Sequence, residues 1–137
     1  MDLQIKEITE DQATDVDDRL MEYYEKYSGE CPEGDIRFGL FDQDRLIGGV
    51  LASVADFAIC YVNTVYVDPE YRRSGCGRHL VSELEERARN IGANIVHLSY
   101  FDFENANGAD FYRRLGYEEV GGYKTDQYSE HFFIKRL

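Results

Sequence analysis

A chain of 137 residues, 43% hydrophobic and 14% aromatic, is long enough to fold as one domain and too apolar to be disordered. Its net charge of −12 argues against nucleic acid as a partner, because binding to a phosphate backbone needs a broad basic face. No apolar run is long enough to cross a bilayer, and the N-terminus lacks the pattern of a secretory signal. We therefore expect a single domain over residues 1–137, with neither membrane nor nucleic acid as a partner.

The first half of the chain predicts four strands and one helix. Residues 3–8 alternate apolar and polar side chains, which indicates a strand. A helix is expected from residues 9–11 up to Ser28-Gly29, with one apolar and aromatic face. Residues 35–43 and 46–54 predict a hairpin, and residues 57–67 predict a further strand.

The second half predicts two helices and three strands. The first helix begins near Gly77 and has apolar residues at helical spacing. It ends at Gly92, a residue suited to the left-handed conformation that closes a helix. A strand over 94–100, a short helix over 109–115 and strands over 117–121 and 131–136 follow. The order β-α-β-β-β-α-β-α-β-β predicts an α/β (α+β) fold, a mixed sheet with helices on its faces.

Three cysteines, Cys31, Cys60 and Cys76, are odd in number and widely spaced. No Cys-x-x-Cys pair or Cys/His ligand spacing occurs, so we expect neither a disulfide nor a metal site, and a reducing, cytoplasmic location. The acidity of the chain is compatible with a cationic substrate, since negative clefts attract amines. Solubility alone, or a high-salt habitat, would also account for it.

The segment 65–78 is the most informative part of the sequence. An apolar strand ends there, breaks at Asp68-Pro69, and leads through a basic, glycine-containing loop into a helix. Such a loop leaves N–H groups unpaired at a helix N-terminus, which suits a phosphate or pyrophosphate. Gly75 and Gly77 remove side chains where a phosphate approaches the backbone. Three arginines can add charge-assisted hydrogen bonds: Arg72, Arg73 and Arg78. On these residues alone, a surface turn with incidental arginines explains the pattern equally well.

Two motifs together carry a family resemblance. Arg72-x-x-Gly75-x-Gly77, directly after the strand, resembles the acetyl-coenzyme A loop of the GNAT superfamily of N-acetyltransferases. Further along, Asn105 followed by Tyr112 and then Gly116-Tyr117 is similar to that family's second signature. The order of predicted elements also resembles the family over nearly the whole chain. The resemblance implies a mixed, mostly antiparallel sheet of about seven strands and the use of acetyl-coenzyme A as acetyl donor.

In this family two parallel strands splay apart and coenzyme A enters the gap. The resemblance implies that the strand ending at Val67 pairs with the pantetheine arm, that the loop holds the pyrophosphate, and that a main-chain N–H near Val65 or Val67 polarises the thioester carbonyl. Asn105 would contact the pantetheine amides, although Asn107 competes for this role. The residues expected to bind the donor are Val65, Tyr66, Val67, Arg72, Arg73, Ser74, Gly75, Cys76, Gly77, Arg78 and Asn105.

Tyr112 is the expected catalytic residue, since a phenol near the sulfur can donate a proton or hydrogen bond to the departing thiolate. Packing of a helix aromatic on the sheet would explain the same residue. The sequence departs from the family where Arg73 replaces a frequent glycine and Cys76 a frequent aliphatic residue. It shows no acid within residues 61–64, where some members carry the base. The sequence leaves the base open among the following: Glu22, Asp56, His97 and a chain of ordered waters.

The resemblance implies an enzyme that moves an acetyl group to a primary amine by direct attack in a ternary complex, because no Cys or Ser lies beside an evident base. The acidic and aromatic residues 22–25 could meet a cationic amine, either a small molecule or an exposed peptide amine. A solvated acidic face with Tyr24 in the core is the favoured interpretation of the same residues. A non-catalytic coenzyme A sensor or interaction module is the alternative, and a phosphate-binding domain of another kind is a third. Family members often dimerise, so a homodimer is also expected.

Overall fold

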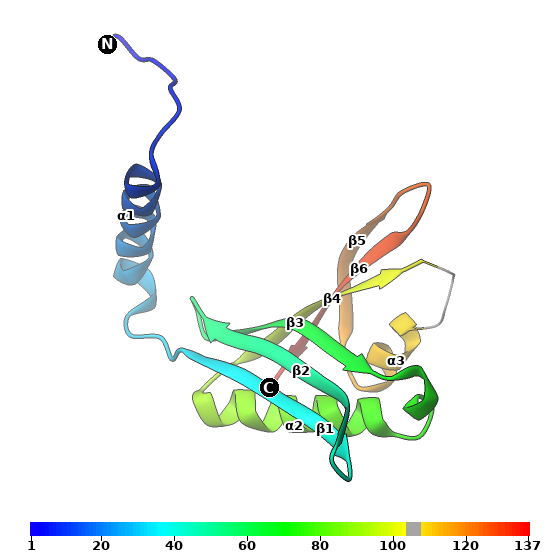
Figure 1. Ribbon diagram of the computed structural model, residues 1–137. Coiled ribbons are helices and arrows are strands. Elements are labelled where there is room, and N and C mark those ends of the chain that lie inside the picture. The colour runs from blue at the N-terminus through cyan, green and yellow to red at the C-terminus, as the bar shows by residue number, and fades with distance from the viewer. Residues whose placement is uncertain (104–107) are drawn as a thin grey trace. The chain divides into compact units, whose positions relative to one another are not determined.

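The computed structural model describes residues 1–103 and 108–137, which form two compact units, residues 1–31 and 32–137. The first unit contains α1 (Glu10–Ser28), confirming the predicted helix (Figure 1). The Thr9 side chain accepts a hydrogen bond from the Gln12 N–H at 3.2 Å, and the Gln12 side chain accepts one from the Thr9 N–H at 3.0 Å. This capping box fixes the start of the helix, and Gly29 closes it.

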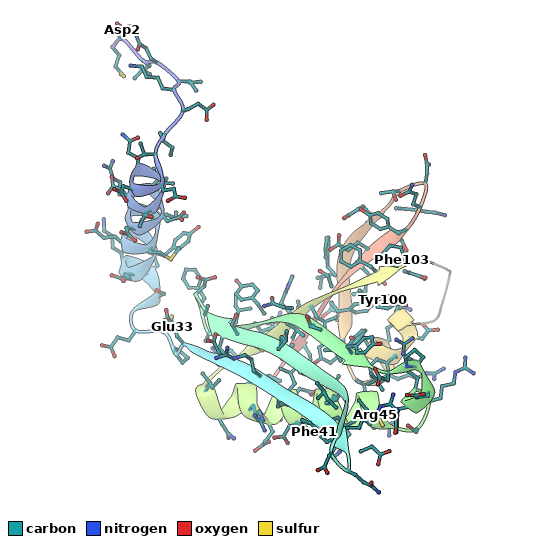
Figure 2. The ribbon with its side chains drawn as sticks, in the orientation of Figure 1. Asp2, Glu33, Phe41, Arg45, Tyr100 and Phe103 are labelled. Atoms are coloured by element: carbon teal, nitrogen blue, oxygen red, sulfur yellow. The ribbon has the colours of Figure 1, made fainter. Side chains whose placement is uncertain are left out.

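The strand expected over residues 3–8 is not formed. Within the described residues this segment pairs with no strand, and its apolar side chains Leu3, Ile5 and Ile8 are exposed. A strand needs a neighbour for its main-chain groups, and alternation of side chains does not provide one. Every residue of α1 is likewise at least partly exposed (Figure 2).

The second unit is built on a sheet whose described strands run in the order β1-β2-β3-β4-β6-β5. The strands are β1 (Gly34–Asp42), β2 (Arg45–Ala55), β3 (Ile59–Val67), β4 (Ile95–Asp102), β5 (Glu118–Lys124) and β6 (Ser129–Arg136). The pair β3 and β4 is parallel and the other four pairs are antiparallel. The predicted mixed, mostly antiparallel fold is therefore confirmed, with six described strands in place of about seven.

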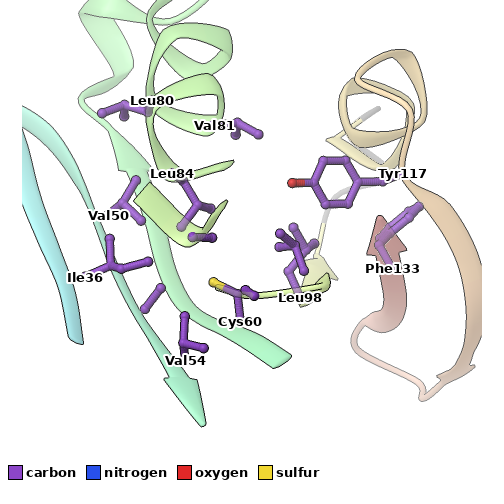
Figure 3. Close-up of a cluster of buried hydrophobic side chains, with 14 of the residues drawn as sticks. Ile36, Val50, Val54, Cys60, Leu80, Val81, Leu84, Leu98, Tyr117 and Phe133 are labelled. Carbon is purple, nitrogen blue, oxygen red and sulfur yellow. The ribbon is translucent and has the colours of Figure 1, made fainter. Parts of the chain in front are cut away.

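Two helices pack against the sheet of the second unit: α2 (Cys76–Ile91) packs against β1, β2 and β3, and α3 (Gly108–Arg114) packs against β4 and β5. Apolar residues three or four apart on α2 bury one face of that helix. Figure 3 shows Leu80 and Leu84 of α2 directed toward strand residues, which include Ile36, Val50 and Val54. This packing fixes the N-terminus of α2 at the end of β3.

A partly buried ion pair joins α2 to β6. Lys135 Nζ lies 2.6 Å from Glu85 Oε1 and also donates to the Leu115 carbonyl, just after α3, at 2.8 Å. Glu85 is only 6% exposed, so its charge depends on this partner. The pair thereby holds the end of α3 in place. Within the described residues, no helix combines the length and the apolar character needed to cross a membrane.

Candidate active site

A cleft lies between β3 and β4. The two strands pair at Ile59–Ile95, Cys60–Val96 and Tyr61–His97 and at no later described position, although both continue for several residues. Figure 1 shows them diverging beyond that point. The resulting cleft has a volume of about 230 Å³ and is lined by residues 62–66 of β3, residues 98–101 of β4 and Tyr112 of α3. The facing strand edges leave main-chain groups available to a ligand that pairs like a strand.

A β-bulge contributes to this divergence. Leu51 and Ala52 of β2 face Thr64 and Val62 of β3, so Asn63 is an extra residue on β3. A bulge bends its strand and increases the local twist, and bulges are frequent next to active sites. Asn63 itself lines the cleft. The bulge lies two residues after Tyr61, the last residue of β3 that pairs with β4, which favours separation of the strands there.

The loop after β3 contains η1 (Pro69–Tyr71), a single turn of 3-10 helix, and reaches α2 at Gly75. No side chain caps this end of α2, and within the described residues the main-chain N–H groups of residues 73–78 donate to no acceptor. Gly75 has φ of +87° and Arg73 has φ of +63°. Arg73, which stands where many family members have glycine, therefore adopts the left-handed backbone conformation that glycine favours. For a residue with a side chain this conformation costs about 1 kcal/mol.

Arg72 has a more specific place than the sequence predicts. Its Nε donates to the Val67 carbonyl at 2.9 Å, and its guanidinium carbon lies 5.7 Å from the centre of the Tyr66 ring. The side chain thus folds back over the end of β3, where its charge also acts on Tyr100 of the cleft. Arg73 and Arg78 are exposed and form no ion pair with another described residue. These two guanidinium groups remain available to an anion.

The two glycines of the loop have different surroundings. A Cβ on Gly75 would meet no atom within 4 Å, which leaves this position open to a ligand. A Cβ on Gly77 would lie 3.0 Å from Phe111 of α3, so Gly77 serves the packing of α3 on α2. Cys76 packs against the core, as the sequence suggested, and its sulfur lies 3.3 Å from the Ser74 hydroxyl. Gly77 therefore has a packing role, and its expected approach to a phosphate stays a prediction.

Tyr112 faces the cleft from α3. Its ring packs against Phe111, Tyr117 and Phe133, with ring centres 5.0 to 5.8 Å apart. Burial, with a smaller contribution from Tyr100, raises the pKa of Tyr112 to about 12. The phenol is therefore neutral at physiological pH and can donate a hydrogen bond into the cleft, while its ring also belongs to the core packing. The packing interpretation of Tyr112 is therefore confirmed, and its catalytic role stays a prediction.

Tyr100 lines the cleft and was not expected from the sequence. Gly108 allows its ring to lie against the start of α3, where a Cβ would come within 2.2 Å of it. The pKa of Tyr100 is raised, mainly by burial. Alternation within β4 places Tyr100 on the same face as the buried Leu98, but the divergence of the strands makes it part of a cleft wall. That divergence has no signal in the sequence of β4 alone.

Two of the residues considered as general bases, Asp56 and His97, lie near Tyr61. Burial, and then Asp56, raise the pKa of Tyr61, and the His97 ring is centred 5.9 Å from the Tyr61 ring, beside the last paired positions of β3 and β4. Neither is among the described lining residues of the cleft. Glu22 belongs to α1, in the other unit. Asn105 and its competitor Asn107 lie outside the described residues.

The model of the Acetyltransferase (GNAT) family matches residues 3–117, and the chain belongs to this family. It is 32% identical over 69 residues to an uncharacterized N-acetyltransferase of Methanocaldococcus jannaschii, covering 50% of this chain and 30% of that protein. It is also 32% identical over 60 residues to the thialysine N-epsilon-acetyltransferase of Bos taurus, covering 44% of this chain and 35% of that protein. The chain spans about a third of the length of these curated relatives.

Solved structures confirm the fold. An acetyltransferase from Bacillus cereus matches with a TM-score of 0.83 at 24% identity, covering 98% of both chains. An aminoglycoside 6'-N-acetyltransferase complexed with coenzyme A matches with a TM-score of 0.67 at 16% identity, covering 98% of this chain and 97% of that one. The ribosomal-protein-S18-alanine N-acetyltransferase of Escherichia coli matches with a TM-score of 0.65 at 18% identity, covering 86% of this chain and 75% of that one.

Proposed function

We propose that the chain is an acetyltransferase that moves the acetyl group of acetyl-coenzyme A to a primary amine. The observation that carries this proposal is the cleft between the diverging parallel strands, with free N–H groups at one end and Tyr112 in its wall. Membership in the GNAT family and the coenzyme A complex of a structural neighbour support the same donor. The curated relatives, both named N-acetyltransferases, support an amine as acceptor.

The residues of the loop and β3 would bind and orient the donor. Main-chain N–H groups of residues 73–78 and the positive end of α2 suit its pyrophosphate, and the exposed Arg73 and Arg78 add charge. Gly75, with open space around it, permits close approach. The unpaired edge over residues 62–67 would pair with the pantetheine arm, and an N–H at Val65 or Val67 would polarise the thioester carbonyl.

Tyr112 would stabilise the departing sulfur. Its hydroxyl is neutral at the working pH because burial raises its pKa to about 12. It can therefore donate a hydrogen bond to a thiolate as the amine attacks. Burial also raises the pKa of Cys60 to about 11 and leaves its thiol in the core, which favours direct attack over an acetyl-cysteine at that position.

Two experiments test the proposal in sequence. Calorimetric titration with acetyl-coenzyme A should show saturable binding that coenzyme A competes for, and its absence would refute the proposal. Release of free thiol should then depend on an amine drawn from a panel of polyamines, aminoglycosides and lysine peptides. Binding without thiol release for every amine class would favour the non-catalytic coenzyme A sensor instead.

The expected location and assembly also stay proposals. The odd and widely spaced cysteines support a reducing cytosol. The resemblance to a family whose members often dimerise supports a homodimer. Light scattering coupled to size exclusion tests the assembly, and a monomer at micromolar concentration would refute it.

A further inference from the structure

Three polar side chains form a hydrogen-bonded chain on the hairpin of β5 and β6. The Ser129 Oγ lies 3.1 Å from His131 Nε2, and His131 Nδ1 is hydrogen-bonded to Glu119 Oε1. Ser129 and His131 are two positions apart on β6, so their side chains project from the same face. The order hydroxyl, imidazole and carboxylate is the arrangement that activates a serine nucleophile, which is recognised by geometry rather than by sequence position.

The direction of the hydrogen bonds follows from the chemistry of the groups. An ionised carboxylate only accepts, so His131 Nδ1 carries the hydrogen that Glu119 receives. In the neutral imidazole Nε2 then holds a lone pair, and the Ser129 hydroxyl donates to it. This is the tautomer in which His131 can remove the proton of Ser129.

Glu119 is held as an anion. Arg113 Nη2 donates to Glu119 Oε2 at 2.6 Å while Oε1 bonds His131, so both carboxylate oxygens are occupied. Hydrogen bonds from Arg113 and then from His131 lower the pKa of Glu119. The anion therefore orients the imidazole and stabilises the positive charge that His131 gains when it accepts a proton.

The three side chains lie close to the cleft and to solvent. His131 pairs across the sheet with Tyr100 of the cleft, and their ring centres are 6.3 Å apart. Ser129 and His131 are each half-buried, so neither residue is enclosed in the core. On the other side His131 pairs with Gly122, which places no side chain opposite the imidazole.

We propose that Ser129 is the nucleophile of a second activity, the hydrolysis of short activated acyl groups carried by an ester or thioester. His131 is its general base, and Glu119 is the positioning residue. This activity does not depend on the proposed acetyl transfer to amines, because none of the three residues lines the cleft or belongs to the loop.

The reaction is balanced with water as co-reactant. The Ser129 oxygen attacks the acyl carbon while its proton moves to His131 Nε2, and the bond from carbon to the alcohol or thiol breaks with that proton going to the leaving group. Water then attacks the acyl-serine, giving up a proton to Nε2. The carboxylic acid departs as the proton returns to Ser129.

Covalent labelling tests the nucleophile directly. A fluorophosphonate probe should phosphonylate Ser129 with loss of fluoride, identified by peptide mass spectrometry. Ser129→Ala and His131→Gln should each abolish the label at this peptide. Ser53→Ala, which removes a half-buried hydroxyl from β2, is the matched control and should leave it unchanged. Absence of the label in the wild-type protein, or its persistence in His131→Gln, would overturn the proposal.

Turnover distinguishes the source of the acyl group. p-Nitrophenyl acetate and, separately, acetyl-coenzyme A without amine serve as probes, and Ser129→Ala should lower kcat at least about 100-fold for one or both. Glu119→Gln should lower kcat about tenfold or more and leave KM unchanged. A merely structural role of Glu119 would not affect kcat alone. Ester and thioester hydrolysis that are both insensitive to Ser129→Ala would refute the activity. Amine-dependent thiol release should survive Ser129→Ala, so the two functions fail separately.

Discussion

The substitution Tyr112→Phe isolates the hydroxyl that faces the cleft. Tyr112 Oη makes no hydrogen bond with another described residue, whereas its ring packs against Phe111, Tyr117 and Phe133. Phenylalanine keeps that ring and therefore those contacts. We expect the free energy of unfolding to change by less than about 1 kcal/mol, so a functional effect can be assigned to the lost hydroxyl.

The size of the effect follows from the pKa of Tyr112. At about 12 the phenol is a weaker acid than a thiol, whose ordinary pKa is about 8.5, so complete transfer of its proton to the departing thiolate is unfavourable by about 5 kcal/mol. Its contribution is then a hydrogen bond to an anion, worth about 1.5–3 kcal/mol. Tyr112→Phe should lower kcat by about 10- to 160-fold.

The assay is thiol release at saturating acetyl-coenzyme A and amine, with donor affinity measured by calorimetry. Donor affinity should be nearly unchanged, because the hydrogen bond forms chiefly as charge develops on sulfur. Tyr61→Phe, a half-buried tyrosine of β3 outside the cleft lining, is the matched control and should retain wild-type kcat. A kcat for Tyr112→Phe within twofold of wild type would refute the reasoning.

The raised pKa of Tyr112 also determines how its contribution to kcat depends on pH. A raised pKa keeps the phenol protonated below about pH 12, so the donor is lost only as pH rises through that value. Tyr112 should therefore produce no alkaline decline of kcat between pH 8 and 10. If wild type showed such a decline and Tyr112→Phe abolished it, the raised pKa would be wrong.

Three further substitutions test the loop and its support. Gly75→Ala forces a side chain to φ of +87° at about 1–2 kcal/mol and should weaken acetyl-coenzyme A binding about tenfold by calorimetry; unaltered affinity would argue against this loop. Gly77→Ala should lower the melting temperature by several degrees, because its Cβ would press on Phe111 at 3.0 Å, and an unchanged melting curve would contradict that packing. Lys135→Met should lower the free energy of unfolding by about 3–5 kcal/mol in urea melts by leaving Glu85 unpaired; a loss that Glu85→Leu does not largely restore in the double variant would exclude this cause.

Local signals in the sequence predict most of the elements and the loop that we propose to bind an anion. The apolar spacing of α2 and the glycine at its end suffice to place that helix, since each reports a backbone preference of its own neighbourhood. The loop can also be predicted from neighbouring residues, because a strand, a turn and a helix N-terminus follow one another along the chain. The two motifs also predict the GNAT family, and the match of the family model over residues 3–117 confirms it.

Features that depend on contacts between distant segments are not predicted. The cleft opens because β3 carries a bulge at Asn63 and stops pairing with β4 after Tyr61, and neither strand alone contains that information. The steric role of Gly77 requires knowing that Phe111 lies over it. Residues 3–8 show the opposite failure, a strand pattern without a described neighbour to pair with.

A substitution at Arg73 is expected to change thermal stability and ligand affinity in opposite directions. Replacement by glycine would relax a left-handed residue and raise the free energy of unfolding by up to about 1 kcal/mol. The same replacement would remove one of the two unpaired guanidinium groups from the mouth of the proposed diphosphate site. A screen for heat tolerance alone would therefore favour glycine here, and a screen for acyl transfer would restore the arginine.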